Sequence, residues 1–192
     1  MNACLLREHS RSCPICSLVV QSNSYLGDRA PSSKGLRLVL DTNVWLDWLV
    51  FDDPGILPLK SAVEAGEAEV FMASACENEL ARVLSYPLGK AALDANAQAM
   101  CLQECRKTVR WLEGSSSQDV PGLPVCRDPA DQKFLELARD CGADFLVTKD
   151  RALLILARRK DPTLSFQIIT PQQFTQWKGA DWELPRRSTA QS

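Results

Sequence analysis

The chain has 192 residues and 45% of them are hydrophobic, so one domain of this size can bury a full core without disulfides. Lys and Arg number 22 against 24 Asp and Glu, which gives a formal net charge of −2 and a pI near 5.5. This balance is not typical of a protein that holds nucleic acid on a broad basic face, so any such contact is expected to be local. The sequence has no apolar run near the ~20 residues of a membrane span and no signal peptide, so we expect a cytoplasmic protein.

The N-terminal 35 residues are rich in Ser, Asn, Arg and Gly, lack periodicity and end in the breaker string APSSKG. We therefore expect a flexible leader at 1–35, a domain at 36–178 and a tail at 179–192. Cys13 and Cys16 have knuckle-like spacing, with Cys4 and His9 nearby, but the leader has no second tight pair. An ordinary polar leader is the favoured interpretation, and a zinc site is the alternative.

Cysteine is abundant, and two accounts of it are open. The pattern could indicate a secreted disulfide framework, but most of the cysteines lie in apolar or helical stretches. Buried free thiols in a reducing compartment are the favoured account. The eight residues are Cys4, Cys13, Cys16, Cys76, Cys101, Cys105, Cys126 and Cys141.

In the first half of the domain, apolar runs that predict strands alternate with periodic runs that predict helices. Ser74 is a plausible N-cap, and Glu77 completes a capping box with it. The predicted elements are a strand at 36–41, a helix at 42–50, a break at 52–55, a helix at 56–66, a strand at 70–73 and a helix at 75–85.

The second half continues the alternation. Asp128 predicts a helix N-cap, Pro129 suits the first helical position, and Gly142 predicts the end of that helix. The predicted elements are a helix at 91–112, a loop at 114–127, a helix from 128, a strand at 145–148, a helix to 159, a strand at 166–169 and a helix through 177. This order predicts an α/β fold with a mainly parallel sheet and right-handed crossovers.

Four acids occupy the positions where function gathers in such folds. Asp41 and Asp150 directly follow predicted strands, whereas Glu79 and Asp131 lie near helix starts. If they meet at one edge, each like-charged pair at ~4 Å costs about 4 kcal/mol at an effective dielectric near 20. Such a cluster needs a cation, and hard oxygen ligands favour Mg²⁺ or Mn²⁺.

Each acid also has a simpler explanation. Asp131 could complement a helix dipole, and Glu79 could lie on a solvated helix face. Asp128 fits a cap better than a ligand, Asp144 fits a turn before its strand, and Asp47 is expected to face elsewhere on its helix. The two acids that end apolar strands are harder to dismiss, because burial there is costly unless the charge is used.

Several motifs, in order, resemble the PIN-domain family. They are LVLDTNVW at 38–45, ELARVL at 79–84, DPADQKFLELA at 128–138 and GADFLVTKD at 142–150. The run IITPQQF at 168–174 is similar to the closing strand of a subgroup of toxin components of toxin–antitoxin pairs. Lys149 departs from the pattern, which has a small residue there, and the single His9 lies outside the domain.

The resemblance implies a three-layer sandwich around a parallel sheet and an Mg²⁺- or Mn²⁺-dependent endoribonuclease. It assigns Asp41, Glu79, Asp131 and Asp150 as catalytic, metal-binding acids. It also implies supporting roles for Asn43, Thr148 and Asp128. Because the domain has no histidine base, a metal-activated water would be the nucleophile.

Cations near these acids suggest a phosphate path, although solvated helix ends explain them equally well. They are Arg127, Lys133, Lys149, Arg151 and the run 158–160, of which we expect Lys133, Lys149 and Arg151 to contact RNA. Packing in a core or dimer explains the aromatic residues better than base stacking does. These are Trp45, Trp48, Phe51 and Trp111.

The leading hypothesis is a metal-dependent ribonuclease that cleaves single-stranded RNA, forms a homodimer and is silenced as a toxin by a small antitoxin protein. The alternative is a catalytically silent PIN-fold module that binds proteins. A phosphatase or receiver-like domain is disfavoured, because no Asp-x-Asp pair follows the first strand and no Gly-rich phosphate loop is present.

Overall fold

The structure is a computed structural model that describes residues 35–88, 91–112, 122–159 and 161–178. The predicted leader and tail lie outside these ranges, as do Cys4, His9, Cys13 and Cys16. Within the described ranges, no helix combines the length and the apolar character that a bilayer crossing requires.

A five-stranded sheet forms the centre of the domain, and all its strand pairs are parallel. The strand order is β5-β2-β1-β6-β7, so the chain runs outward from β1 in one direction and then from β6 in the other. The strand order therefore reverses between β1 and β6. The strands are β1 Leu36–Leu40, β2 Ala68–Met72, β5 Val109–Trp111, β6 Phe145–Val147 and β7 Gln167–Ile169.

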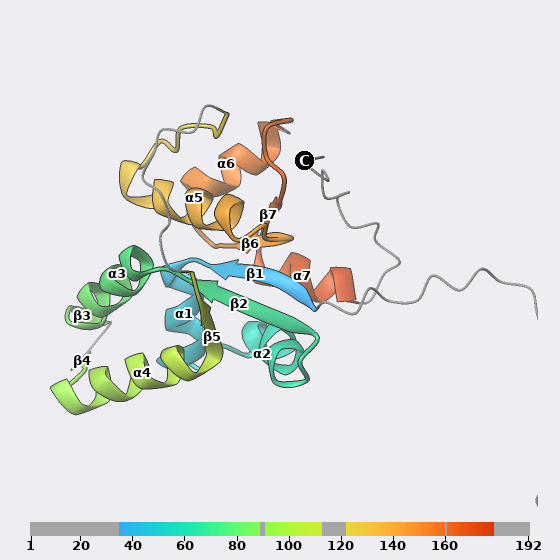
Figure 1. Cartoon of the computed structure of the whole chain (residues 1–192). Helices are drawn as coiled ribbons and strands as arrows, with labels where there is room; N and C mark the ends of the chain where they lie inside the picture. The colour runs from blue at the N-terminus through green and yellow to red at the C-terminus, as the bar shows by residue number, and fades with distance from the viewer. Residues whose placement is uncertain (1–34, 89–90, 113–121, 160, 179–192) are drawn as a thin grey trace, which may run out of the picture. The chain divides into compact units, whose positions relative to one another are not determined.

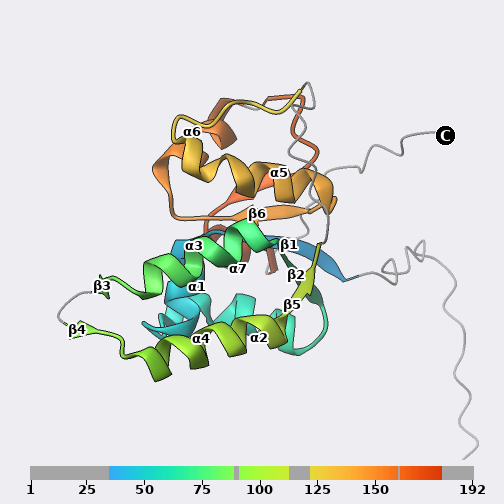
Figure 2. The same ribbon diagram turned by 60° about the vertical axis from the view of Figure 1, so that its left-hand side comes forward.

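Helices cover both faces of this sheet. Figure 1 shows α5 and α6 above the sheet and α1, α2 and α4 below it, and Figure 2 shows the same layers after a turn of the molecule. The predicted three-layer α/β sandwich is thus confirmed. The helices are α1 Thr42–Leu49, α2 Leu57–Glu64, α3 Ser74–Leu84, α4 Ala95–Thr108, α5 Gln132–Asp140, α6 Arg151–Arg159 and α7 Pro171–Lys178, with short 3₁₀ turns η1 Pro54–Ile56 and η2 Pro129–Asp131.

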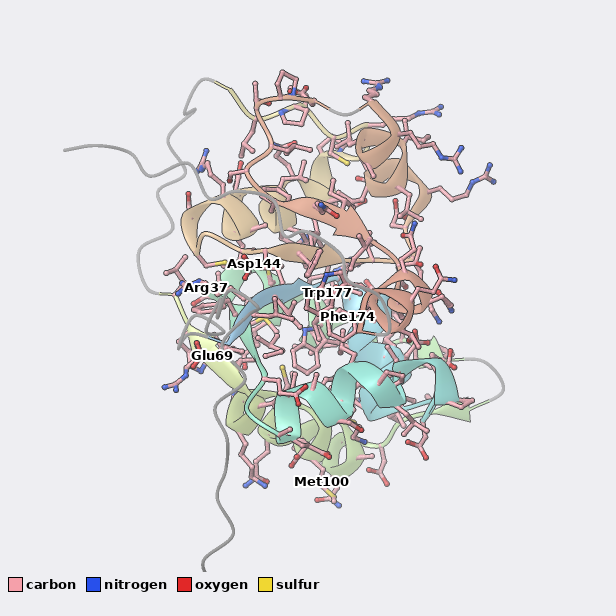
Figure 3. The ribbon with its side chains drawn as sticks, turned by 90° about the vertical axis from the view of Figure 1, so that its right-hand side faces the viewer. Arg37, Glu69, Met100, Asp144, Phe174 and Trp177 are labelled. Atoms are coloured by element: carbon pink, nitrogen blue, oxygen red, sulfur yellow. The ribbon has the colours of Figure 1, made fainter. Side chains whose placement is uncertain are left out.

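The central strand shows why the sheet needs two helical layers. Leu38, Val39 and Leu40 of β1 point alternately to opposite faces, and all three are buried. Each buried side chain of this size contributes about 1.5–3 kcal/mol relative to exposure. Phe174 and Trp177 of α7 add an aromatic cluster, with ring centroids 6.4 and 5.3 Å from that of Phe145 on β6 (Figure 3).

The amino ends of β1 and β6 are closed by a polar cluster around Arg37. Its backbone N–H donates to Asp144 Oδ2 at 2.8 Å, and its Nε donates to the carbonyl of Cys141 at 2.7 Å. The guanidinium also lies 4.3 Å from the ring centroid of Phe71. Figure 3 labels Arg37 and Asp144 side by side at this end. Asp144, expected only to mark a turn, is therefore a buried partner of the first strand.

One predicted helix is too long. Residues 109–111 were expected to end the helix at 91–112, but α4 ends at Thr108 and these residues form β5, at the edge of the sheet next to β2. Val109 has extended backbone angles and a buried side chain, so pairing with Val70 wins over continuation of the helix. A short antiparallel pair, β3 Pro87–Leu88 with β4 Ala91–Ala92, was also not predicted.

The predicted helix ends are partly right. Asp128 caps η2, because its Oδ1 accepts from the N–H of Ala130 at 2.9 Å, and Gly142 has the positive φ of 58° that ends α5. The capping box at Ser74 is wrong, since α3 begins one residue earlier with Ala73 as its N-cap. The carboxylate expected to complete that box, Glu77, pairs instead with Arg106.

The cysteines of the described part support the free-thiol interpretation. All five are free, and four of them are buried. Burial raises the pKa of Cys76 and Cys105 to about 12, so these thiols stay protonated at neutral pH.

Candidate active site at the carboxyl edge of the sheet

Asp41 follows β1 at the point where the strand order reverses, and its carboxyl group is almost fully buried. Its Oδ2 accepts hydrogen bonds from Thr148 Oγ1 at 2.7 Å and from Asn43 Nδ2 at 3.4 Å. Burial raises the pKa of Asp41, while the hydrogen bonds from Thr148 and from the backbone of Thr42 oppose the shift. The nearby charge of Asp150 raises it further, so these two acids lie within electrostatic reach of each other.

Thr148 connects the two acids that end strands. It is fully buried at the end of β6, where its hydroxyl donates to Asp41 and accepts from the backbone N–H of Asp150 at 2.8 Å. One oxygen of Asp150, Oδ1, accepts from the N–H of Ala152 at 2.6 Å at the start of α6. A single hydroxyl therefore fixes the Asp41 carboxylate and the backbone that carries Asp150.

Asp131 gives the strongest sign that the four acids share one neighbourhood. It lies at the end of η2, and its pKa is raised to about 6. Burial is the largest cause, followed by the charges of Asp150, Asp41, Asp128 and Glu79. The chain thus brings together the four predicted acids, although they come from four separate segments.

Glu79 points toward this cluster rather than to a solvated helix face. Its Oε1 accepts from Thr42 Oγ1 at 3.3 Å, and its Oε2 forms an ion pair with Lys133 Nζ. Both side chains of this pair are mostly buried. Lys133 also donates to the carbonyl of Ala130, which ties α5 to η2.

The donor chemistry fits a hard divalent cation, because the site gathers carboxylate oxygens, and burial together with the charges of the neighbouring acids raises the pKa of Asp131. The arrangement is not yet a closed set of ligands, since no three Asp, Glu, His or Cys side chains of the described residues are placed to hold one metal ion. The carboxylate of Glu79 is already paired with the ammonium group of Lys133. Metal binding would require Glu79 to exchange its ammonium partner for the metal.

Lys149, the departure from the family pattern, is an unexpected part of this region. Its Nζ lies 2.5 Å from Asp47 Oδ2 and 3.0 Å from Asp53 Oδ2. The contact with Asp47 is an ion pair without the angular geometry of a hydrogen bond. Asp47 was expected to face elsewhere, yet it is buried and meets the loop that carries Asp150. A lysine at a position that favours a small residue was the sequence signal for this contact.

Among the aromatic residues singled out from the sequence, Trp45 and Trp48 lie on α1 and are buried in the hydrophobic core, with ring centroids 5.6 Å apart. Phe51 and Trp111 are instead 52% and 41% exposed, so core packing does not account for them.

An acid cluster where the strand order of a parallel sheet reverses defines a class of α/β domains that bind their ligand at that edge. Residues 37–152, more than half of the chain, match the family described as PIN domain. The chain therefore belongs to the PIN-domain family, as its motifs indicated. PIN domains are generally nucleases, and they typically use divalent metals.

A solved structure gives a weaker likeness. One chain in the crystal structure of VapBC2 from Rickettsia felis bound to a DNA fragment from their promoter is similar to this protein at 14% identity and a TM-score of 0.48. The match covers 70% of this chain and 98% of that one. At this similarity it carries no conclusion about activity or partners. No curated protein matches the chain.

Proposed function

We propose that this PIN domain is a metal-dependent endoribonuclease that hydrolyses phosphodiester bonds of single-stranded RNA. Asp41, Glu79, Asp131 and Asp150 hold Mg²⁺ or Mn²⁺ and are the catalytic acids. The observation that carries the proposal is the gathering of the four acids: Thr148 hydrogen-bonds both Asp41 and the backbone of Asp150, and burial together with the charges of Asp150, Asp41, Asp128 and Glu79 raises the pKa of Asp131 to about 6. A divalent cation would remove this repulsion.

When bound, the metal would activate water and stabilise the charge of the phosphodiester as it is cleaved. The chain's own residues supply orientation. Thr148 and Asn43 hold the Asp41 carboxylate through hydrogen bonds, and Thr42 meets Glu79. Because these side-chain donors belong to residues within three positions of the ends of β1 and β6, they orient the carboxylates at the edge of the sheet. Asp128 supports Asp131 by capping the turn that carries it.

RNA contacts by Lys133, Lys149 and Arg151 stay a prediction. The three residues differ in how much of their charge is already paired with carboxylates. Lys133 and Lys149 are engaged in ion pairs with carboxylates, so less of their charge is available to phosphate. Arg151 is exposed at the start of α6, and no ion pair joins it to another described residue. Arg151 is therefore the best candidate for a phosphate contact.

We further propose that the protein is the toxin of a toxin–antitoxin pair, with a small antitoxin as partner and a homodimer as its own assembly. A hollow of about 820 Å³ between α1, α2 and α4 offers apolar surface from Trp48, Leu93 and Met100, with Lys60 and Glu104 among its charged residues. Such a surface suits an amphipathic partner segment. Light scattering coupled to size exclusion tests the dimer.

The nuclease proposal is tested by cleavage of single-stranded RNA with Mn²⁺, with and without EDTA. Asp41→Asn should abolish cleavage, and Asp161→Asn, a matched change outside the cluster, should leave it unchanged. An unchanged rate in Asp41→Asn, in a preparation free of contaminating nuclease, would refute the catalytic assignment. Silence of the unaltered protein under every metal condition would favour the alternative, a silent PIN-fold binding module.

A further inference from the structure

The ion pairs of Lys149 join two parts of the chain that flank the acid cluster. Lys149 belongs to the loop between β6 and α6, and its ammonium group lies between the carboxylates of Asp47, in α1, and Asp53, before η1. The backbone closes the same unit, because the N–H of Asp53 donates to the carbonyl of Asp47 at 3.0 Å. Asp53 is also fixed by the N–H of Gly55, which donates to its Oδ1 at 2.8 Å.

The burial of Asp47 shows that Lys149 is more than a surface cation. Asp47 is 7% exposed on a helix whose neighbouring residues Leu46 and Trp48 belong to the core. A buried carboxylate is costly unless an opposite charge meets it, and the only ion pair of Asp47 among the described residues is with Lys149. The Lys149 side chain is itself about two-thirds covered.

The two neighbours of Lys149 in sequence are parts of the acid cluster. Thr148 ties the loop to Asp41 at the start of α1, and Lys149 ties the same loop to Asp47 near the end of α1. Two attachments along one helix fix its position and its direction relative to the loop. Asp150 follows immediately, so its place near Asp41 depends on both attachments. The repulsion between Asp41 and Asp150 acts against that place.

We propose that Lys149 is a positioning residue, whose ion pairs with Asp47 and Asp53 hold the β6–α6 loop against α1 and keep Asp150 near Asp41 for metal binding. The inference rests on the proposed nuclease function and replaces a direct RNA contact as the main role of Lys149. The single positive charge of Lys149 is already paired with the carboxylates of Asp47 and Asp53. These three side chains together are not positively charged, so they do not attract phosphate.

The test compares Lys149→Met, Asp47→Asn, the double variant and Lys149→Arg, with Arg151→Met as the neighbouring cation control. Mn²⁺ affinity is measured by titration calorimetry, kcat and KM on single-stranded RNA are measured at two salt concentrations, and circular dichroism checks the fold. Groups that orient metal ligands typically change metal affinity about 10–100-fold when removed. Lys149→Met and Asp47→Asn should therefore each weaken Mn²⁺ binding on the order of tenfold and lower kcat, with little change in KM.

The remaining variants separate a positioning role from an RNA contact. The double variant should be no worse than Lys149→Met alone, because Lys149→Met already removes the ion pairs with both Asp47 and Asp53. Lys149→Arg should keep the pair and stay near the unaltered protein. Arg151→Met should raise KM and reduce the salt dependence without changing Mn²⁺ affinity.

Three distinguishable results would contradict the positioning role of Lys149, the role of its ion pair, or the nuclease function. A raised KM with unchanged Mn²⁺ affinity in Lys149→Met would make Lys149 an RNA contact. Normal Mn²⁺ affinity in Asp47→Asn would remove the role of the Lys149–Asp47 pair even if Lys149→Met is unfolded, since Asp47→Asn leaves no unpaired buried carboxylate. An unaltered protein that neither binds Mn²⁺ nor cleaves RNA would instead reject the nuclease function.

Discussion

Replacing Thr148 by valine tests how the two strand-ending acids are held. Valine has nearly the same shape but lacks the hydroxyl that donates to Asp41 Oδ2 at 2.7 Å and accepts from the N–H of Asp150 at 2.8 Å. Because Thr148 is fully buried, water does not easily replace either bond. The variant leaves a buried carboxylate without its shortest donor and a backbone N–H without its side-chain acceptor.

The two losses set the expected magnitude. A hydrogen bond to a charged group contributes about 1.5–3 kcal/mol, and an unsatisfied buried group costs about 1–3 kcal/mol. The two effects share one hydroxyl and are not additive, so we expect Thr148→Val to lower the free energy of unfolding by about 2–4 kcal/mol at pH 7 without metal. Urea unfolding in EDTA measures it, with Thr175→Val as the control. The Thr175 hydroxyl donates to the carbonyl of Pro171 on the exposed side of α7, so its loss should cost under about 0.5 kcal/mol.

The pH dependence of the Thr148→Val deficit identifies its cause. The Thr148 bond lowers the pKa of Asp41 against the larger effect of burial, so its loss raises that pKa further. A carboxyl group whose pKa is raised on folding destabilises the fold above that pKa and ceases to do so once protonated. The deficit should therefore be largest at pH 7–8 and shrink as Asp41 takes up its proton at lower pH. A small, pH-independent deficit equal to that of Thr175→Val would refute the reasoning.

Two further changes probe the charges around the site. Asp131→Asn should stabilise the metal-free protein at pH 7 by about 1 kcal/mol. This is less than the free energy that corresponds to the full pKa shift, because the carboxyl group is partly exposed and solvent screens its interactions. Since the pKa of Asp131 is raised to about 6, the unaltered protein should regain this stability as the pH falls from about 6 toward 4; urea unfolding from pH 4 to 8 shows whether the difference vanishes. Lys133→Met should lower the melting temperature in EDTA and enlarge the rise that Mn²⁺ causes, because Glu79 loses its cation; Lys107→Met, which breaks an exposed pair with Glu104, should change neither.

The positions of the acids could be predicted because local sequence determines them. Asp41 ends an apolar strand and Asp128 caps a proline-started turn, and both patterns act within a few residues. A parallel sheet then brings strand ends to one edge whatever the loops between them. The order of the elements thus predicts that Asp41 and Asp150, which follow neighbouring parallel strands, lie near each other, whereas the inclusion of Glu79 and Asp131 rested on the resemblance of their motifs.

The missed features depend on contacts between distant residues. The strand β5 has only three residues and follows a helix without a break in apolar spacing, so its pairing with β2 decides its conformation. The partner of Lys149 could not be predicted either. Asp47 lies about 100 residues earlier, in a helix whose sequence has no feature that marks this residue as buried. Lys133 and Glu79 also meet only through the packing of α5 near α3.

The distribution of lysines around the cluster indicates which acids lack a protein cation and are available to the proposed metal. Lys133 pairs with Glu79, and Lys149 pairs with two acids outside the proposed catalytic set. Asp41, Asp131 and Asp150 form no ion pair with any described residue, although their charges repel one another. A ligand that binds only the folded state stabilises it, so Mn²⁺ should raise the melting temperature without RNA. Because this rise depends on the acids alone, it tests the metal site separately from the choice of RNA substrate.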